Sequence, residues 1–83
     1  MTVLLKFEAD WCSPCKQMIP IIKEIEKEFP KLIIKTVDVD QDSDLAEKYG
    51  IMSLPTLVIE KDDVETARFV GIVDKNKIVE AIE

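Results

Sequence analysis

The order in which strand-like runs and helical periodicity follow one another restricts this chain to few folds. Residues 3–7 are a mostly apolar run of strand-forming residues that is expected to be buried on both faces, and residues 32–39 form a second such run. Between them, apolar residues recur at the spacing of one helix face: Met18, Ile22, Ile25 and Phe29. Pro30 ends that pattern. The segment between the two strands is long enough for a crossover helix, so the strands are expected to be parallel, with a right-handed connection.

The second half of the chain predicts a hairpin and two more helices. Residues 56–60 and 65–70 are strand-like, and the four residues between them are too few for a crossover, so these strands are expected to be antiparallel. A short helix over residues 44–49 is expected to end at Gly50, and Asp74 is expected to cap a last helix. The predicted order is β-α-β-α-β-β-α, an α/β fold with a four-stranded mixed sheet flanked by helices.

Size and charge exclude several classes of function. The length of 83 residues predicts a single domain over residues 1–83. The 17 acidic and 11 basic residues give a net charge of −6, so no nucleic-acid partner is expected. Because the chain has no histidine, Ser–His and Cys–His triads and histidine-based zinc catalysis are excluded. We expect a cytoplasmic protein with no membrane partner, because the N-terminal residues lack a signal-peptide pattern and no apolar run approaches the roughly 18 residues of a membrane span.

The two cysteines are the chemically most informative residues. Cys12 and Cys15 stand three positions apart, where the first strand passes into the long helix. Random placement would give this spacing only about 2–3% of the time. Free backbone N–H groups and the positive end of the helix dipole favour a thiolate on Cys12 at this position. Cys15 lies one turn further on and can close a disulfide with Cys12, while Pro14 suits the first helical turn.

Three other interpretations of the cysteine pair stay open beside a redox-active dithiol, which we favour. A structural disulfide over so short a loop contributes only about 2 kcal/mol in the chain-entropy model. A zinc or iron–sulfur site needs four ligands, whereas the chain offers two thiols and no histidine, so no metal is expected. The third alternative is a pair of ordinary core cysteines.

A run of alternating aspartates imitates the start of a calcium-binding loop: Asp38, Asp40, Asp42 and Asp44. The loop position that requires glycine is Ser43, and the one that requires glutamate is Tyr49. We therefore expect the end of a strand followed by an acidic helix start, which the helix dipole favours, and no calcium.

Further motifs extend along the whole chain. The sequence WCSPCK occupies residues 11–16, and LPT follows at residues 54–56. Shorter matches complete the set: Phe7, Ala9, Pro20, VDVD at 37–40, YGI at 49–51, and Gly71. On these residues the chain resembles the thioredoxin and glutaredoxin superfamily, which implies a thioredoxin fold. It is most similar to the short prokaryotic thioredoxins, archaeal or bacterial, with glutaredoxin-like topology, because it lacks a counterpart of the opening strand and helix of longer members.

The resemblance implies how a substrate is bound. It implies a cis peptide bond at Pro55, beside the disulfide, and pairing of the Leu54 backbone with an extended substrate segment. Trp11, Leu54 and the turn at Gly71 are expected to form an apolar rim around the cysteines. The alternative is that Trp11 and Leu54 are only core residues.

Some positions depart from the family pattern and bear on the pKa values of the thiols. Ser13 replaces the glycine usual in thioredoxins, next to Pro14, at a position that tunes redox poise. Lys6 stands where many thioredoxins place a buried aspartate. Lys6 could lower the thiol pKa values by Coulomb attraction, or act as a base once neutralised by burial. We favour a third interpretation, in which it extends to solvent or pairs with an acid such as Glu8.

We therefore predict a thiol–disulfide oxidoreductase, a protein-disulfide reductase of the thioredoxin type. Cys12 is expected to be the nucleophile and Cys15 the resolving thiol. No bound cofactor is expected, because the disulfide between these two residues carries the electrons. The expected partners of this monomer are oxidised protein substrates and a separate electron donor of the thioredoxin-reductase type. The alternatives are glutaredoxin-like activity, a disulfide isomerase or oxidant, and a non-catalytic interaction module that senses redox state.

Overall fold

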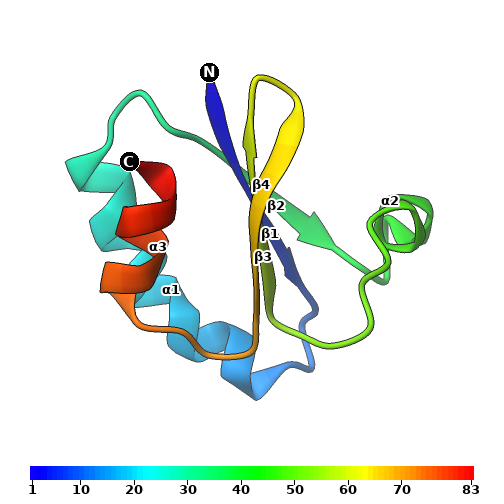
Figure 1. The fold of residues 1–83 in the computed structure, drawn as a ribbon. Coiled ribbons are helices and arrows are strands. Elements are labelled where there is room, and N and C mark those ends of the chain that lie inside the picture. Colours follow the sequence, from blue (N-terminus) through cyan, green and yellow to red (C-terminus); the bar gives the residue numbers. More distant parts are fainter.

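The computed structural model describes residues 1–83 and contains seven elements in the predicted order. The strands are β1 (Thr2–Glu8), β2 (Ile33–Asp38), β3 (Thr56–Lys61) and β4 (Val64–Val70). The helices are α1 (Ser13–Glu28), α2 (Ser43–Lys48) and α3 (Lys75–Ile82). Figure 1 shows the strands as one sheet between the helices. No helix has the length and apolar character needed to cross a bilayer.

The four strands form one mixed sheet in the order β2-β1-β3-β4. β1 pairs in parallel with β2, and α1 is the connection between them, as the sequence predicted. β1 pairs antiparallel with β3, and β3 pairs antiparallel with β4. β1 is an inner strand of the sheet. Its carboxyl end, which leads into the cysteine segment, therefore lies between neighbouring strands and not at the side of the sheet.

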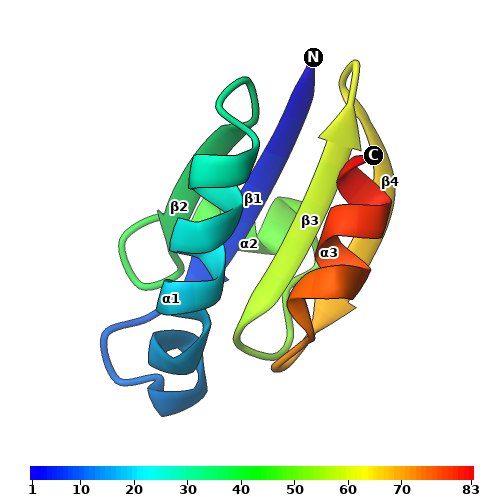
Figure 2. The same ribbon diagram turned by 90° about the vertical axis from the view of Figure 1, so that its left-hand side faces the viewer.

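The helices cover the two faces of the sheet unequally. α1 and α3 lie side by side on one face, and α2 lies on the other (Figures 1 and 2). Successive side chains of a strand point to opposite faces, so Leu4 and Leu5 of β1 enter different clusters. The cluster on the α1/α3 face, called here the large cluster, has eight buried members: Leu4, Met18, Ile22, Ile25, Leu57, Ile59, Ile78 and Ile82. The cluster on the α2 face, called the small cluster, has four: Leu5, Phe7, Val37 and Val58.

Two local predictions need correction. The hairpin loop is shorter than the four residues expected, because the turn consists of Asp62 and Asp63 alone, with φ angles of 51° and 69°. Positive φ at both central residues is typical of the tight turn whose twist matches that of the paired strands. Asp74 precedes α3 as predicted, but its side chain makes no capping hydrogen bond. Its carbonyl oxygen instead accepts a hydrogen bond from the N–H of Lys77.

The aspartate run forms a strand end and a helix start, as predicted. The Asp38 carboxylate accepts hydrogen bonds from the N–H groups of Asp40 and Gln41, and the Asp42 carboxylate accepts one from Leu45 at the start of α2. α2 ends before Gly50, whose φ of 65° lies in the left-handed region that glycine adopts without strain. The turn therefore directs the chain from β2 into α2 through its own side chains.

Candidate active site

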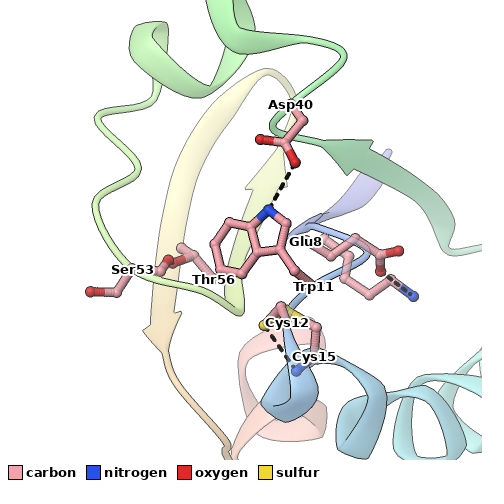
Figure 3. Close-up of a disulfide and its surroundings, with 8 residues drawn as sticks. Glu8, Trp11, Cys12, Cys15, Asp40, Ser53 and Thr56 are labelled. Atoms are coloured by element: carbon pink, nitrogen blue, oxygen red, sulfur yellow. Dashed lines mark hydrogen bonds and ion pairs between the residues drawn. A yellow bond between two sulfur atoms is a disulfide. The ribbon is translucent and has the colours of Figure 1, made fainter.

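The two cysteines lie at the N-terminus of α1. Cys12 is the N-cap residue in an extended conformation, and its Sγ accepts a hydrogen bond from the N–H of Cys15 at 3.2 Å. The two residues form a disulfide across a Cα–Cα distance of 5.3 Å (Figure 3). Ser13 and Pro14 between them form the exposed first turn of α1, where proline fits because its missing N–H would have no helical partner.

The position of Cys12 favours its ionised form. A sulfur at an N-cap receives backbone N–H groups and faces the positive end of the helix dipole. The first turn of α1 contains no acidic residue that would oppose a negative charge. In the reduced protein, this environment favours the thiolate, which is the reactive form of cysteine.

The disulfide is packed in a small apolar cluster of its own. Ala9, Cys12 and Cys15 are buried together, and each cysteine is only 4% exposed. Val39 and Leu54 pack against this cluster, and the same two residues also pack against the small cluster on the α2 face. The apolar neighbours of the cysteines therefore come from the α2 side of the sheet.

A groove of about 570 Å³ opens beside Cys12. It brings residues 11–14 together with residues 52–54, two segments that are far apart in the sequence. Cys15 does not line this groove but a separate hollow of about 360 Å³, together with Glu8, Asp10 and Lys16. Cys12 and Cys15 are joined by one disulfide, but Cys12 lines the groove and Cys15 lines the separate hollow.

Trp11 is a surface residue of the groove and not a core residue. Its side chain is exposed, with 69% of the residue accessible, and its Nε1–H donates a hydrogen bond of 2.8 Å to Oδ2 of Asp40 (Figure 3). Met52 in the second segment of the groove is 95% exposed. Sequence reasoning named Asp40 only in the aspartate run and the VDVD match, did not name Met52, and assigned neither residue to the site. The pairing of Asp40 joins residues 29 positions apart, and nothing in the local pattern signals it.

The segment around Pro55 lies against both the groove and the sheet. The Leu54–Pro55 peptide bond is cis, Pro55 is buried, and Leu54 is half-buried at the groove. The Thr56 hydroxyl donates a hydrogen bond of 2.6 Å to the Ser53 carbonyl. The N–H of Gly71 donates one of 2.7 Å to the Pro55 carbonyl, so the turn at Gly71 lies next to Pro55 without itself lining the groove.

Of the interpretations open for Lys6, the structure shows the pairing with Glu8. The ammonium of Lys6 lies 3.1 Å from Oε1 of Glu8, and the Lys6 side chain is 12% exposed. Glu8 also lines the hollow beside Cys15. The pair therefore places one charge of each sign on the Cys15 side of the disulfide.

The remaining hollows are remote from the cysteines. One is lined by Phe29, Leu32 and Ile82 among others, and a second is lined by Tyr49, Glu60 and charged residues of the hairpin. In the second, the Tyr49 hydroxyl donates a hydrogen bond of 2.6 Å to Oε2 of Glu60. This bond, together with burial and the charge of Glu60, raises the pKa of Tyr49 to about 12.

Comparisons with known proteins agree with this geometry. The thioredoxin family model matches residues 1–83. The chain is 40% identical to the thioredoxin of Chlamydia caviae over 80 residues and 41% identical to that of Bacillus subtilis over 81 residues, covering 96% of this chain and 78% of each relative. Among solved structures, Fasciola hepatica thioredoxin superposes with a TM-score of 0.88 at 37% identity, over 98% of this chain and 77% of the other.

Proposed function

The chain belongs to the thioredoxin family and is a thiol–disulfide oxidoreductase that reduces protein disulfides, and from this premise we propose that Cys12 is its nucleophile and Cys15 its resolving thiol. The fold is the thioredoxin fold, and a redox-active disulfide carries the electrons in place of a bound cofactor. The observation that carries the assignment is that Cys12 lines the open groove and caps α1, whereas Cys15 lies outside that groove.

The reaction consists of two thiol–disulfide exchanges. The Cys12 thiolate attacks one sulfur of the substrate disulfide, forms a mixed disulfide, and releases the other substrate sulfur as a thiolate. Cys15 then gives its proton to water or to the substrate thiolate released in the first step, and its sulfur attacks Cys12 Sγ. This step releases the second substrate sulfur as a thiolate and leaves the Cys12–Cys15 disulfide. Two electrons have passed to the substrate, and a separate reductase supplies two new electrons that reduce the Cys12–Cys15 disulfide again.

Leu54 supplies the main-chain contact to the substrate in this proposal. Its N–H and C=O groups have no hydrogen-bond partner within the chain, although the neighbouring carbonyls of Ser53 and Pro55 are both bonded. Unpaired main-chain groups beside a groove suit an extended segment that adds a short stretch of β-type pairing. Trp11 and Leu54 contribute apolar surface, and Pro55 with Gly71 holds the segment in place.

The partners follow from the same proposal. The protein acts as a cytoplasmic monomer on oxidised protein substrates, and a reductase of the thioredoxin-reductase type is its electron donor. The net charge of −6 supports partners whose docking surfaces are less acidic than this one.

The test of the cysteine roles is a trapping experiment with two matched variants. The Cys15→Ser variant is expected to accumulate a mixed disulfide between Cys12 and a peptide that contains one intramolecular disulfide, because nothing resolves it. The Cys12→Ser variant is expected to accumulate none. Mass spectrometry under non-reducing conditions measures the adduct, and equal trapping by both variants would contradict the assignment.

The reduction potential of the pair tests the direction of electron flow. A value of about −270 mV, as in thioredoxin, is expected from equilibration with a dithiol buffer. A value between about −180 and −120 mV is typical of isomerases and oxidants and would contradict a reductase role.

A further inference from the structure

We propose that Trp11 and Asp40 together form a recognition site for a basic side chain, arginine above all, close in sequence to the cysteine of the substrate that Cys12 attacks. The inference rests on the proposed role of Cys12 as nucleophile. It adds a charge preference to a groove whose lining contains no charged residue of its own.

The indole of Trp11 is both fixed and accessible. The hydrogen bond from its Nε1–H to Asp40 holds the edge of the ring (Figure 3). Trp11 is 69% exposed, so most of this residue is accessible to a ligand. A large exposed aromatic side chain whose orientation is already set loses little conformational entropy when it binds a partner. Trp11 also precedes Cys12 directly, so whatever contacts the indole lies close to the reacting sulfur.

The carboxylate of Asp40 has no cation of its own. The ion pairs of the chain involve Met1, Lys6, Arg68 and Lys75, and none of them reaches the turn over residues 38–44. In the same turn, the carboxylates of Asp38 and Asp42 accept only backbone N–H groups. The side of the groove at Trp11 therefore carries negative charge that this chain leaves unneutralised.

A guanidinium matches these two features at once. A cation over the face of an indole is attracted to the ring, and tryptophan is the best of the aromatic residues for this contact. The flat guanidinium stacks on the ring while its remaining N–H groups can donate to the Asp40 carboxylate. The thioether of Met52, 95% exposed in the opposite segment of the groove, offers a flexible apolar contact to the alkyl stem of the same side chain.

The experiment compares two peptides, each with one disulfide, that differ only in the residue next to the attacked cysteine, arginine or glutamine. We expect kcat/KM to be about three- to tenfold higher for the arginine peptide, from one exposed cation–π contact and one solvent-exposed charge pair. Asp40→Asn keeps an oxygen that can accept the indole N–H but removes the charge, so the ratio of the two kcat/KM values should fall. Trp11→Leu should lower the ratio as well.

The matched control is Asp44→Asn, which removes one charge from the beginning of α2, near Asp40 in sequence but without a contact to Trp11. The ratio should stay at the wild-type value in this variant. The proposal is overturned if the wild-type ratio is near one, if Asp40→Asn leaves it unchanged, or if Asp44→Asn lowers it as much as Asp40→Asn does. Failure of the wild type to reduce either peptide would overturn the assigned role of Cys12, and this inference with it.

Discussion

α1 and α3 lie on one face of the sheet and α2 lies on the other (Figure 2). The first face has eight buried apolar side chains in its cluster, whereas the second has four. The disulfide belongs in sequence to α1, but its apolar neighbours Val39 and Leu54 are shared with the small cluster. With twice as many buried members, the large cluster is expected to contribute more to the stability of the fold. The small cluster contributes less to stability and more to the shape of the active site.

The sharpest test of this difference uses adjacent leucines of β1. Leu4 belongs to the large cluster and Leu5 to the small one, and both are buried. Leu4→Ala should lower the free energy of unfolding by about 4 kcal/mol, because the two helices over it leave a cavity that cannot collapse. Leu5→Ala should cost about 2–3 kcal/mol, because a single short helix can move to fill the space.

Urea unfolding monitored by circular dichroism measures both values. A domain of this length has a total stability of about 4–12 kcal/mol, so Leu4→Ala is expected to remove between about a third and all of that stability. An equal cost for the two substitutions, or a larger cost for Leu5→Ala, would contradict the unequal roles of the two faces.

A second pair of substitutions separates stability from activity. Val39 and Val79 are both half-buried; Val39 packs against the cysteine cluster, and Val79 packs against the large cluster. Each change to alanine should cost about 1 kcal/mol of stability from the apolar area lost. Only Val39→Ala should lower kcat/KM for a disulfide substrate several-fold, because it loosens the packing around Cys12.

Steady-state reduction assays at a temperature where both variants are folded measure this difference. Equal activity of the Val39→Ala and Val79→Ala proteins would show that the small cluster has no special effect on the site.

Tyr49, which packs against the small cluster, also makes a side-chain hydrogen bond. Tyr49 packs on Phe7 with ring centroids 5.4 Å apart, and its hydroxyl bonds to Glu60. Tyr49→Phe should keep the ring contact and lower the free energy of unfolding by about 1 kcal/mol near neutral pH.

The hydrogen bond to Glu60, with burial and the charge of Glu60, raises the folded-state pKa of Tyr49 from 10.0 to about 12. Above pH 10 the unfolded chain releases the phenol proton while the folded chain still holds it. The stability advantage of wild type over Tyr49→Phe is therefore complete below pH 10 and falls as the pH rises towards 12. Urea titrations at neutral pH and at about pH 11 test this, and a gap that widens at the higher pH would contradict the assigned bond.

The smallest effect is expected at the ion pairs that join the two helices of the large-cluster face. Lys75 of α3 pairs with Glu24 and Glu28 of α1, and the bond to Glu28 raises the pKa of Lys75 above its usual value. These groups are accessible to water, which weakens such pairs. Lys75→Met should therefore reduce stability less than Tyr49→Phe does, and a larger loss would mean that charge pairs, not apolar contacts, hold α3 in place.

The elements of the fold followed from periodicity, and their exact ends did not. Apolar spacing located α1 because Met18, Ile22 and Ile25 repeat over several turns, and the short loop after β3 predicted the hairpin. The first and last residues of the helices and strands depend on single hydrogen bonds, which cannot be predicted from residue types alone. Asp74 has the residue type of a capping side chain but makes no capping bond, and the turn at Asp62 and Asp63 is tighter than the loop that was predicted.

The candidate site was predictable where its residues are neighbours in the chain and not where the fold brings them together. Cys12 and Cys15 are close in the chain, and their position between the apolar run of β1 and the periodic residues of α1 placed them at the start of that helix. Asp40 reaches Trp11 from the turn after β2, and Met52 lies in an irregular segment without periodicity. Their contribution depends on tertiary position, and no local pattern encodes it.

The hydrogen bond from the Cys15 N–H to the Cys12 sulfur makes one backbone amide a reporter of the whole redox cycle. In the proposed mechanism, that sulfur is in turn a thiolate, part of a mixed disulfide, and part of the internal disulfide, and its power to accept a hydrogen bond differs in each state. The chemical shift of the Cys15 amide proton should therefore take three separate values during turnover. A single nitrogen-15 label at Cys15 would let nuclear magnetic resonance follow each state of the enzyme without a dye or a coupled assay.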